Sequence, residues 1–380
     1  MEEIMERFIG VVESPYKFLK EWKKKNNMQI IGHFLTDIPE ELIHAAGFLP
    51  AAIIGSNDKI SKAESYVQDF ACSLVKSTLE LALNGELDFL DGVIIPHICD
   101  STRSFPLVWE LHASPPFFDY LRFPKDMTNN RARGYLINEL GRLKRELGKL
   151  SNKEISNDRL KDSIRLFNEN RELLRKLYNL RRENPTLLSA FQLFSIIKSS
   201  MFMPKDEHNG LLSRLISELE NIKEKAPAED GRLRLFIAGK LWEPPQILDM
   251  IEGIGALIVG DELFIGSRYI DKDVSLEGDP VAALADKQIS MMPFGGYFYP
   301  HNERFNFLFE MVKENRADGV IFLHSKFCET MSYDYPDLKK QLDEKGIPSL
   351  IIETELQTTS LEQARTRLQA FAEMSGGNAK

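Results

Sequence analysis

Three cysteines are the residues of this chain whose type and placement are best suited to chemistry. Cys99 and Cys328 each follow a continuous apolar run, in DGVIIPHIC and DGVIFLHSKFC, and each precedes an acidic residue. Cys72 stands where a polar loop enters the amphipathic segment CSLVKSTLELAL. In open parallel sheets, ligands bind beyond the carboxyl ends of the strands. We therefore expect the three thiols to converge in a cleft between two α/β domains.

The number of cysteines limits what they can do together. Three in 380 residues cannot form a disulfide framework, and no two have the C-x2–4-C spacing of structural zinc. A cysteine–histidine nucleophile needs one thiol and leaves the matched pair unexplained. An iron–sulfur cluster accepts thiolates from distant parts of a chain, usually four of them, so three would leave one iron open to water or a substrate oxygen. The alternative is that the thiols are packed core residues.

Three histidines are candidate catalytic residues. His97 and His324 occupy matched positions ahead of Cys99 and Cys328, and His33 is expected at the same sheet edge, after the first strand and just before a helix. Imidazoles at these places are suited to donate hydrogen bonds to cluster sulfurs or to protonate a reduced intermediate. The alternative is that each is a hydrogen-bonded histidine at a strand end.

Three more polar residues on the loops near these positions are candidates for supporting roles. Ser101 is predicted to cap the helix that follows Cys99. Arg103 and Arg268 are suited to bind an anion such as a phosphate group, and a surface ion pair is the alternative for both.

Strand and helix patterns alternate at both ends of the chain, which predicts an α/β protein with doubly wound parallel sheets. The two parts also resemble each other. Pro39 and Gly47, which bracket the first helix of the alternating pattern, recur with the same spacing as Pro245 and Gly253, and DGVI recurs ahead of a cysteine. We expect two Rossmann-like (flavodoxin-like) parallel-sheet domains related by internal duplication.

The middle of the chain has long helical patterns rich in Leu, Arg, Lys and Glu. Their charged faces are either solvated or a partner surface. The predicted organisation is a first α/β domain with an N-terminal helix (1–127), an all-α domain (128–228) and a second α/β domain (229–380). The segment KEKAPAEDGR is predicted to be a linker.

Charge and hydropathy exclude some partners. The chain has 48 Lys and Arg against 57 Asp and Glu, a net charge of −9, which argues against nucleic acid. It contains no apolar run of about 18 residues, and its N-terminus lacks the apolar region of a signal peptide. We expect a cytoplasmic protein with no membrane or nucleic-acid partner.

Several segments of the chain, taken together, resemble the family of ATP-dependent benzoyl-CoA reductase and 2-hydroxyacyl-CoA dehydratase subunits. The similar segments follow the family's order over nearly the whole chain: IPEELIHAAGFLP, FACSLVKSTLE, LDGVIIPHICDSTRSF, DELFIGSRYIDKDV, ADGVIFLHSKFCE, YDYPDLKKQLDEKGIP and QARTRLQAF. The resemblance implies that Cys72, Cys99 and Cys328 ligate one four-iron four-sulfur (4Fe-4S) cluster between two Rossmann-like domains.

The resemblance also implies partners and a substrate class. These are a homologous cluster-binding subunit in a heterodimer, a separate ATP-hydrolysing iron–sulfur activator component, and an acyl-CoA or aroyl-CoA substrate that reacts through a radical. This chain has no phosphate-binding glycine motif, so ATP is expected only on the separate component. The segments GSRYIDKDVSLEGDP and PHICDSTRSF favour a benzoyl-CoA reductase of anaerobic aromatic degradation. A dehydratase, an electron-relay subunit and a scaffold subunit are the alternatives.

Overall fold

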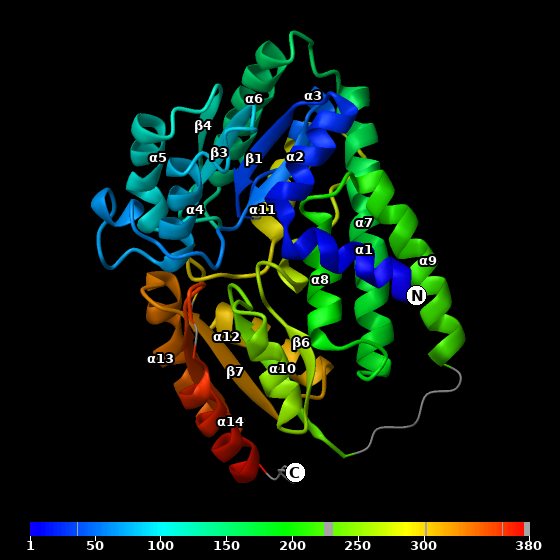
Figure 1. Ribbon diagram of the computed structural model, residues 1–380, viewed down its shortest axis with the longest axis vertical. Helices are drawn as coiled ribbons and strands as arrows, with labels where there is room; N and C mark the ends of the chain where they lie inside the picture. The colour runs from blue at the N-terminus through cyan, green and yellow to red at the C-terminus, as the bar shows by residue number, and fades with distance from the viewer. Residues whose placement is uncertain (36, 224–230, 301, 359, 376–380) are drawn as a thin grey trace.

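The computed structural model describes residues 1–35, 37–223, 231–300, 302–358 and 360–375. Figure 1 shows two α/β regions, one above the other, with long helices along one side. The predicted linker falls largely on residues 224–230, which lie outside the described residues. Within the described ranges, no helix combines the length and apolarity needed to cross a membrane.

The first sheet consists of the strands expected from the apolar runs near the N-terminus. Within the described residues it has four parallel strands in the order β2-β1-β3-β4. The strands are β1 (Ile30–Phe34), β2 (Leu49–Ile53), β3 (Gly92–His97) and β4 (Phe118–Arg122). The connecting helices are α3 (Glu40–Ala46), η1 (Ala63–Ser65), α4 (Ser73–Leu83) and α5 (Ser101–His112). Strands β1 and β2 are buried throughout, as expected for strands covered on both faces.

The second sheet repeats this strand order as β6-β5-β7-β8, again parallel and again four-stranded in the described residues. Its strands are β5 (Leu233–Gly239), β6 (Ala256–Asp261), β7 (Gly319–Ser325) and β8 (Ser349–Thr354). Its helices are α10 (Gln246–Gly253), η2 (Ser267–Ile270), α12 (Glu303–Glu314), α13 (Glu329–Glu344) and α14 (Glu362–Met374). In each sheet the strand order reverses beside the first strand, and ligands bind beyond the strands at such a switch point.

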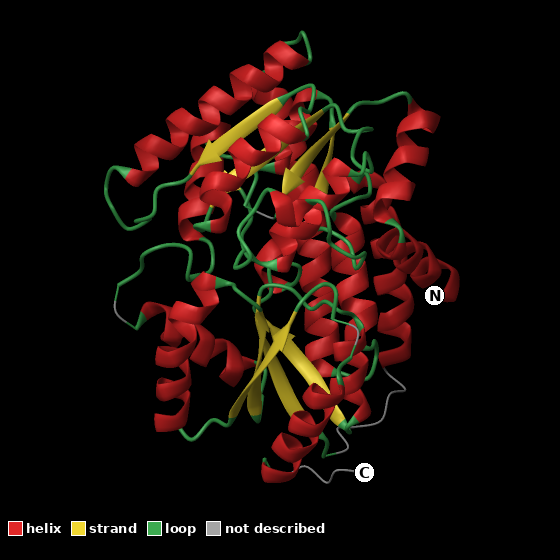
Figure 2. Ribbon diagram, turned by 60° about the vertical axis from the view of Figure 1, so that its left-hand side comes forward, coloured by secondary structure: helices red, strands yellow, loops and turns green. Residues whose placement is uncertain are grey.

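Long helices pack beside both sheets, as the red ribbons of Figure 2 show. They are α6 (Ala132–Leu150), α7 (Asn157–Glu183), α8 (Ala190–Ser200) and α9 (Lys205–Lys223). The helices α1 (Glu2–Glu13), α2 (Pro15–Asn26) and α11 (Pro280–Ser290) come from other parts of the chain. Because α1 packs on α8 and α11 packs on α6, these contacts cross the predicted domain boundaries, which stay a prediction.

One large hydrophobic core joins these parts. It runs from α1 through both sheets to α14, and a smaller core lies between the second sheet, α12 and α13. Buried apolar area is the main stabilising contribution to such a fold. The shared core therefore holds the ends of the two sheets in a fixed relation to each other.

Candidate functional site

Each of the three cysteines lies at the N-terminal end of a helix. Cys72 is the N-cap residue of α4 and Cys328 is the N-cap residue of α13, while Cys99 directly precedes Asp100, the N-cap residue of α5. The first amides of a helix have no intrahelical acceptor and carry a partial positive charge. Helix N-terminal amides stabilise a thiolate, which is the form of cysteine that binds metals, but at Cys72 burial outweighs them.

The structure brings the three cysteines within electrostatic reach of one another. The pKa of Cys72 is raised to about 12, first by burial and then by the neighbouring Cys328 and Cys99. Asp100, beside Cys99, donates its backbone N–H to the carboxylate of Glu329, beside Cys328. The loops beyond β3 and β7 therefore meet at the cysteines.

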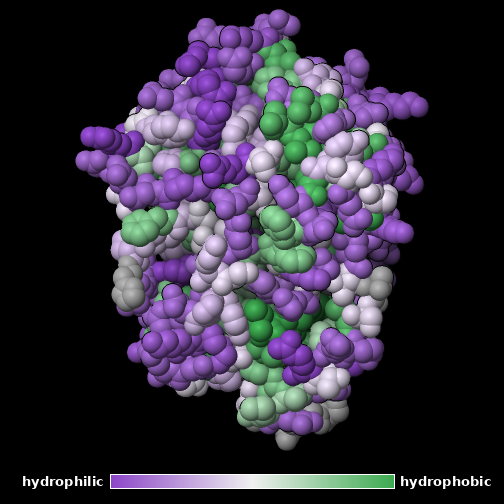
Figure 3. Space-filling view, turned by 90° about the vertical axis from the view of Figure 1, so that its left-hand side faces the viewer, coloured by the Kyte–Doolittle hydropathy of each residue, from purple (hydrophilic) through white to green (hydrophobic). Residues whose placement is uncertain are grey.

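A cavity of about 600 Å³ adjoins this meeting point. Its lining includes a chain neighbour of every cysteine: Ala71, Asp100 and Glu329. Aromatic side chains lie at its rim, and Phe70 and Tyr333 are 68% and 82% exposed. Figure 3 shows the side of the molecule that carries α5 and α13. Separate apolar patches, coloured green, lie there within a mainly hydrophilic surface.

Two threonine hydroxyls lie against cysteine sulfurs. Cys99 Sγ is 3.5 Å from Thr102 Oγ1, and Cys328 Sγ is 3.4 Å from Thr330 Oγ1. Both threonines are almost completely buried. Hydroxyl contacts of this kind orient a thiolate ligand and adjust its electron density.

The prediction that Ser101 caps α5 was wrong. The N-cap position is Asp100, and no side chain makes a cap hydrogen bond there. Instead, Thr102 Oγ1 accepts the backbone N–H groups of Ile98 and Cys99, both at 3.0 Å. A hydroxyl inside the first turn therefore satisfies the amides that precede the helix.

Two lysines that belong to no sequence motif face the cysteines. Lys240 follows β5, and its ammonium group donates to Thr330 Oγ1 and lies 4.2 Å from the ring centroid of Phe294. Burial lowers the pKa of Lys125, while the charge of Cys99 opposes this shift. The site therefore combines three thiols with two nearby cations. No spacing signal in the sequence distinguishes either lysine.

His97 and His324 lie beside the cysteine loops, as their positions in the sequence required. Burial lowers the pKa of His97, and the charge of Lys125 lowers it further. His324 Nε2 is 3.1 Å from Ser332 Oγ, and burial lowers the pKa of His324 against the opposing charge of Glu353. Both lowered pKa values favour the neutral imidazole, which can accept or donate a hydrogen bond.

His33 takes part in a different, fully buried network. Its Nδ1 is 2.7 Å from the Leu35 carbonyl oxygen, and its Nε2 is 3.1 Å from Glu40 Oε1. Glu40 Oε2 accepts from the Tyr269 hydroxyl at 2.5 Å, and Lys205 donates to the same hydroxyl at 2.6 Å. Burial alone would raise the pKa of Glu40, but Lys205, His33 and Tyr269 together hold it at about 2. Both ring nitrogens of His33 are thus engaged inside the protein.

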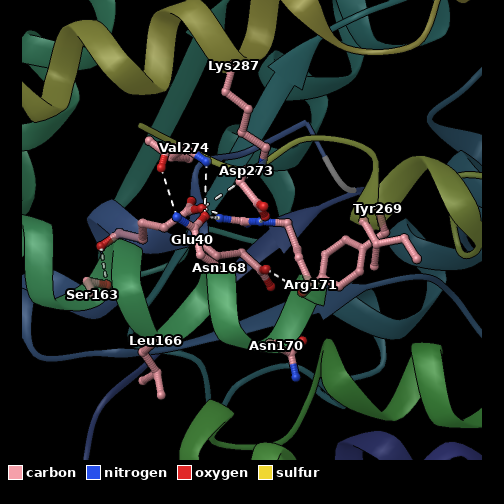
Figure 4. Close-up of polar contacts among 12 residues, drawn as sticks. Glu40, Ser163, Leu166, Asn168, Asn170, Arg171, Tyr269, Asp273, Val274 and Lys287 are labelled. Carbon is pink, nitrogen blue, oxygen red and sulfur yellow. Dashed lines mark hydrogen bonds and ion pairs between the residues drawn. The ribbon is translucent and has the colours of Figure 1, made fainter. Parts of the chain in front are cut away.

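The same network continues through Glu41 into the long helices. Figure 4 shows Glu40 and Tyr269 together with Arg171 and Asn168 of α7. Glu41 Oε1 accepts from Arg171 of α7 at 2.8 Å and lies 3.9 Å from the ammonium group of Lys287 on α11. Arg171 also donates to Asn168 Oδ1 at 2.6 Å, and Asn168 in turn bonds the backbone of Val274. These contacts tie α3 of the first sheet to α7, to α11 and to the segment after η2. They fix how the two α/β regions meet.

The two arginines suggested for anion binding lie in different surroundings. Arg103 is exposed at the start of α5, where an anion can reach it. Arg268 is 3% exposed, donates to the Met292 carbonyl oxygen and lies 3.6 Å from Asp37. Asp37 therefore balances the charge of Arg268 inside the protein. This corresponds to the ion-pair alternative, except that the pair is buried and not at the surface.

The donor set at the cysteines fits a cluster better than a single ion. Among the described residues, no three His, Cys, Asp or Glu side chains form a group that could hold one metal ion. A cubane cluster holds its thiolates apart by the width of the cube, so they need not gather around one point. Thiolates are the usual ligands of such clusters, and the three helix N-termini here carry free cysteines.

The fold and this site define a class: an α/β protein with two parallel sheets of the same strand order, whose cysteine-bearing loops meet over one cavity. Comparison with known proteins then gives the family. The sequence model of the 2-hydroxyglutaryl-CoA dehydratase D-component matches residues 35–375, and this chain belongs to that family.

Full-length relatives support the assignment. The chain is 32% identical to an (R)-phenyllactyl-CoA dehydratase beta subunit of Clostridium sporogenes, over 96% of this chain and 97% of the relative. It is 31% identical to a lactoyl-CoA dehydratase subunit beta of Anaerotignum propionicum, over 98% and 99%. It is 29% identical to a benzoyl-CoA reductase subunit of Thauera aromatica, over 93% of each chain. The resemblance seen in the sequence segments is confirmed, as is membership of a family of enzyme subunits.

Proposed function

We propose that this chain is the iron–sulfur subunit of an enzyme that acts on CoA thioesters, with Cys72, Cys99 and Cys328 as ligands of one 4Fe-4S cluster. One observation carries the proposal: chain neighbours of all three cysteines, which come from both α/β regions, line a single cavity. Core thiols of independent origin would have no reason to gather there. A cluster with three protein thiolates leaves its fourth iron position free for another ligand.

The bound cluster would supply single electrons of low potential, and the residues of this chain would position it and limit the access of water. Cys72 and Cys328 reach it from helix N-termini, whose amides offset the negative charge of the thiolates. The nearby Lys240 adds a positive charge. His97 and His324, beside the same loops, are proposed as hydrogen-bond donors to cluster sulfurs or, in their protonated form, as proton donors to the reacting species; their lowered pKa values favour the first role. His33 is proposed to support this site through Glu40.

Two reactions suit such a subunit. The first is ATP-dependent reduction of a benzoyl-CoA ring, which the segments around Cys99 and Arg268 favour. The second is dehydration of a 2-hydroxyacyl-CoA, and the named dehydratase relatives, at 30 to 32% identity, favour it. Both need an electron added to a thioester carbonyl system. Both also need ATP hydrolysis, which we assign to a separate iron–sulfur activator component.

The relatives are named as subunits, so we propose a heterodimer with a homologous cluster-binding subunit. The aromatic rim of the cysteine cavity supports a docking role for this face, since exposed rings such as Phe70 and Tyr333 are typical of protein interfaces. The shared strand order of the two sheets also supports internal duplication within this chain. The exposed rim supports the proposal that an electron donor or a substrate approaches the cluster site from this side.

The proposal is tested by anaerobic reconstitution with iron and sulfide. The wild-type chain is expected to bind about four iron atoms with the broad visible absorbance of a cluster. Cys99→Ser is expected to lose the cluster, whereas Ser101→Ala, a change at the same helix start, keeps it. A wild-type chain that stays colourless and free of iron under these conditions would refute the cluster and favour a scaffold subunit.

The reaction is tested on the complex purified anaerobically with its partners. Reduction of benzoyl-CoA with ATP supports the reductase, and water loss from a 2-hydroxyacyl-CoA supports the dehydratase. Crystals soaked with each thioester separate a substrate-binding subunit from an electron relay, because a relay cluster would have no thioester beside it.

A further inference from the structure

Lys240 lies at the point in the second sheet where a ligand site is expected. It directly follows β5, and Cys328 comes shortly after the neighbouring β7, so the two residues flank the switch point of the sheet. The rings of Phe294 and Phe264 lie 4.2 and 5.5 Å from the ammonium group and hold the cation in place. The backbone carbonyl of Lys240 also accepts from the Phe264 N–H at 2.9 Å.

Gly239 brings Lys240 to this position. Its φ of 152° is one that side chains rarely allow, and a Cβ there would come within 2.5 Å of the Leu323 carbonyl oxygen. The end of β5 therefore packs directly against the backbone of β7. This close approach lets the next residue reach across to the loop that carries Cys328.

The Thr330 hydroxyl lies between Lys240 and Cys328, and the chemistry of the three groups fixes which of them donates each hydrogen bond. An ammonium group has only donors, so Thr330 Oγ1 must accept from Lys240. Among the described residues, the other partner of that hydroxyl is Cys328 Sγ at 3.4 Å. A sulfur bound to iron carries no proton, so the hydroxyl hydrogen must then point at the sulfur. The result is a chain of two hydrogen bonds that begins at a positive charge and ends at a cluster ligand.

We propose that Lys240, acting through Thr330, raises the reduction potential of the cluster held by Cys328. The inference rests on the proposed cluster site and goes beyond it by assigning a control of the potential. Reduction adds a negative charge that spreads onto the thiolate sulfurs, and hydrogen bonds to those sulfurs stabilise it. Because the donating hydroxyl is itself polarised by a cation, its bond to sulfur is stronger than that of an ordinary threonine. Lys240 and Thr330 are positioning residues, since neither would touch the substrate.

Other charges near Lys240 do not remove this effect. Asp334 also senses the charge of Lys240, but Asp334 lies 3.4 Å from Arg304, which pairs with it. Lys125 adds a second positive charge on the side of Cys99. Asp100 and Glu329 bring negative charge to the same place, so the proposed effect of Lys240 rests on its hydrogen-bonded path to the Cys328 sulfur and not on the net charge of the site.

The test uses the full chain reconstituted anaerobically and measures iron content and the midpoint potential, followed by EPR or visible absorbance during a redox titration. Lys240→Met and Thr330→Val are each expected to retain iron and to make reduction about tenfold less favourable, which is about 59 mV for one electron. Thr330→Ser keeps the hydroxyl and is expected to restore the wild-type midpoint. The double variant should shift no further than the larger single change, because both residues act through one path. Lys313→Met removes an exposed lysine of α12 and serves as the control.

The outcomes distinguish this inference from the proposed function. If the wild-type chain binds no iron, the proposed function fails first. If the variants bind iron and keep the wild-type midpoint, the cluster stands and the control by Lys240 is refuted. Loss of iron from both Lys240→Met and Thr330→Val would also refute it, because their role would then be to build the site.

Discussion

Breaking the ion pair between Arg171 and Glu41 should strongly destabilise the fold. The two side chains are 5% and 1% exposed and meet at 2.8 Å, between α7 and the start of α3. Among the described residues, Arg171→Met leaves Glu41 with Lys287, at 3.9 Å, as its ion-pair partner. A buried charge deprived of its partner costs about 3–5 kcal/mol. We expect a loss of this size in the free energy of unfolding, measured by urea denaturation at pH 7.

A control and a double variant sharpen the test. Arg165→Met, on the same helix, removes an arginine from a pair with Asp162 that is more than half exposed, and it should cost less than about 1 kcal/mol. Arg171→Met combined with Glu41→Leu removes both buried charges and should be more stable than Arg171→Met alone. A loss below about 1 kcal/mol for Arg171→Met would refute the reasoning. So would a double variant whose loss equals the sum of the two single losses, because that shows no coupling.

Three further predictions concern other regions. Gly239→Ala should lower the melting temperature because its Cβ meets the Leu323 carbonyl oxygen, whereas Gly253→Ala, with open space around it, should not. Burial and Lys205 lower the pKa of His208 to about 3 in the folded protein. As the pH falls below 6.5, His208 is therefore protonated in the unfolded chain before it is protonated in the folded one. Between pH 6.5 and about pH 3, His208 should lower the free energy of unfolding by up to about 1.4 kcal/mol for each pH unit. The variant His208→Gln should show a smaller dependence on pH in acid denaturation. Tyr333→Ser should weaken binding of the partner subunit about tenfold in a titration without changing the melting temperature, and unchanged affinity would refute a docking role for the rim.

Much of the fold could be predicted because it depends on local patterns. Apolar β-branched runs defined β1, β3 and β7, and Gly47 was predicted to end α3, where its φ of 97° fits a left-handed C-cap. The cysteine positions could be predicted for the same reason, since each follows directly from where a strand or helix begins or ends. The domain boundaries were harder to define, because α1 and α11 pack on helices far away in the sequence.

The parts that the sequence did not reveal depend on contacts between distant segments. Ser101 looks like an N-cap by its place in the sequence, but the backbone turns so that Thr102 receives the free amides instead. Arg268 lies in a polar loop in the sequence, yet the fold buries it against Asp37. Lys240 has no motif of its own, and its role depends on Thr330, which lies in the first turn of α13, after a different strand.

The two sheets share their strand order but differ in how each supports its cysteine. Thr102 Oγ1 accepts two neutral backbone amides and donates to the Cys99 carbonyl oxygen at 3.1 Å, so its contact with Cys99 Sγ at 3.5 Å gains no polarisation from a full charge. Thr330 Oγ1 accepts an ammonium group, which makes the bond to Cys328 the stronger of the two. Electron density added to a cluster between them would therefore be stabilised more on the side of the second sheet. In the proposed cluster site, two sheets with the same strand order would supply matched cysteines, and one lysine beyond β5 would still bias the added charge toward Cys328, because it changes the donor to that single sulfur.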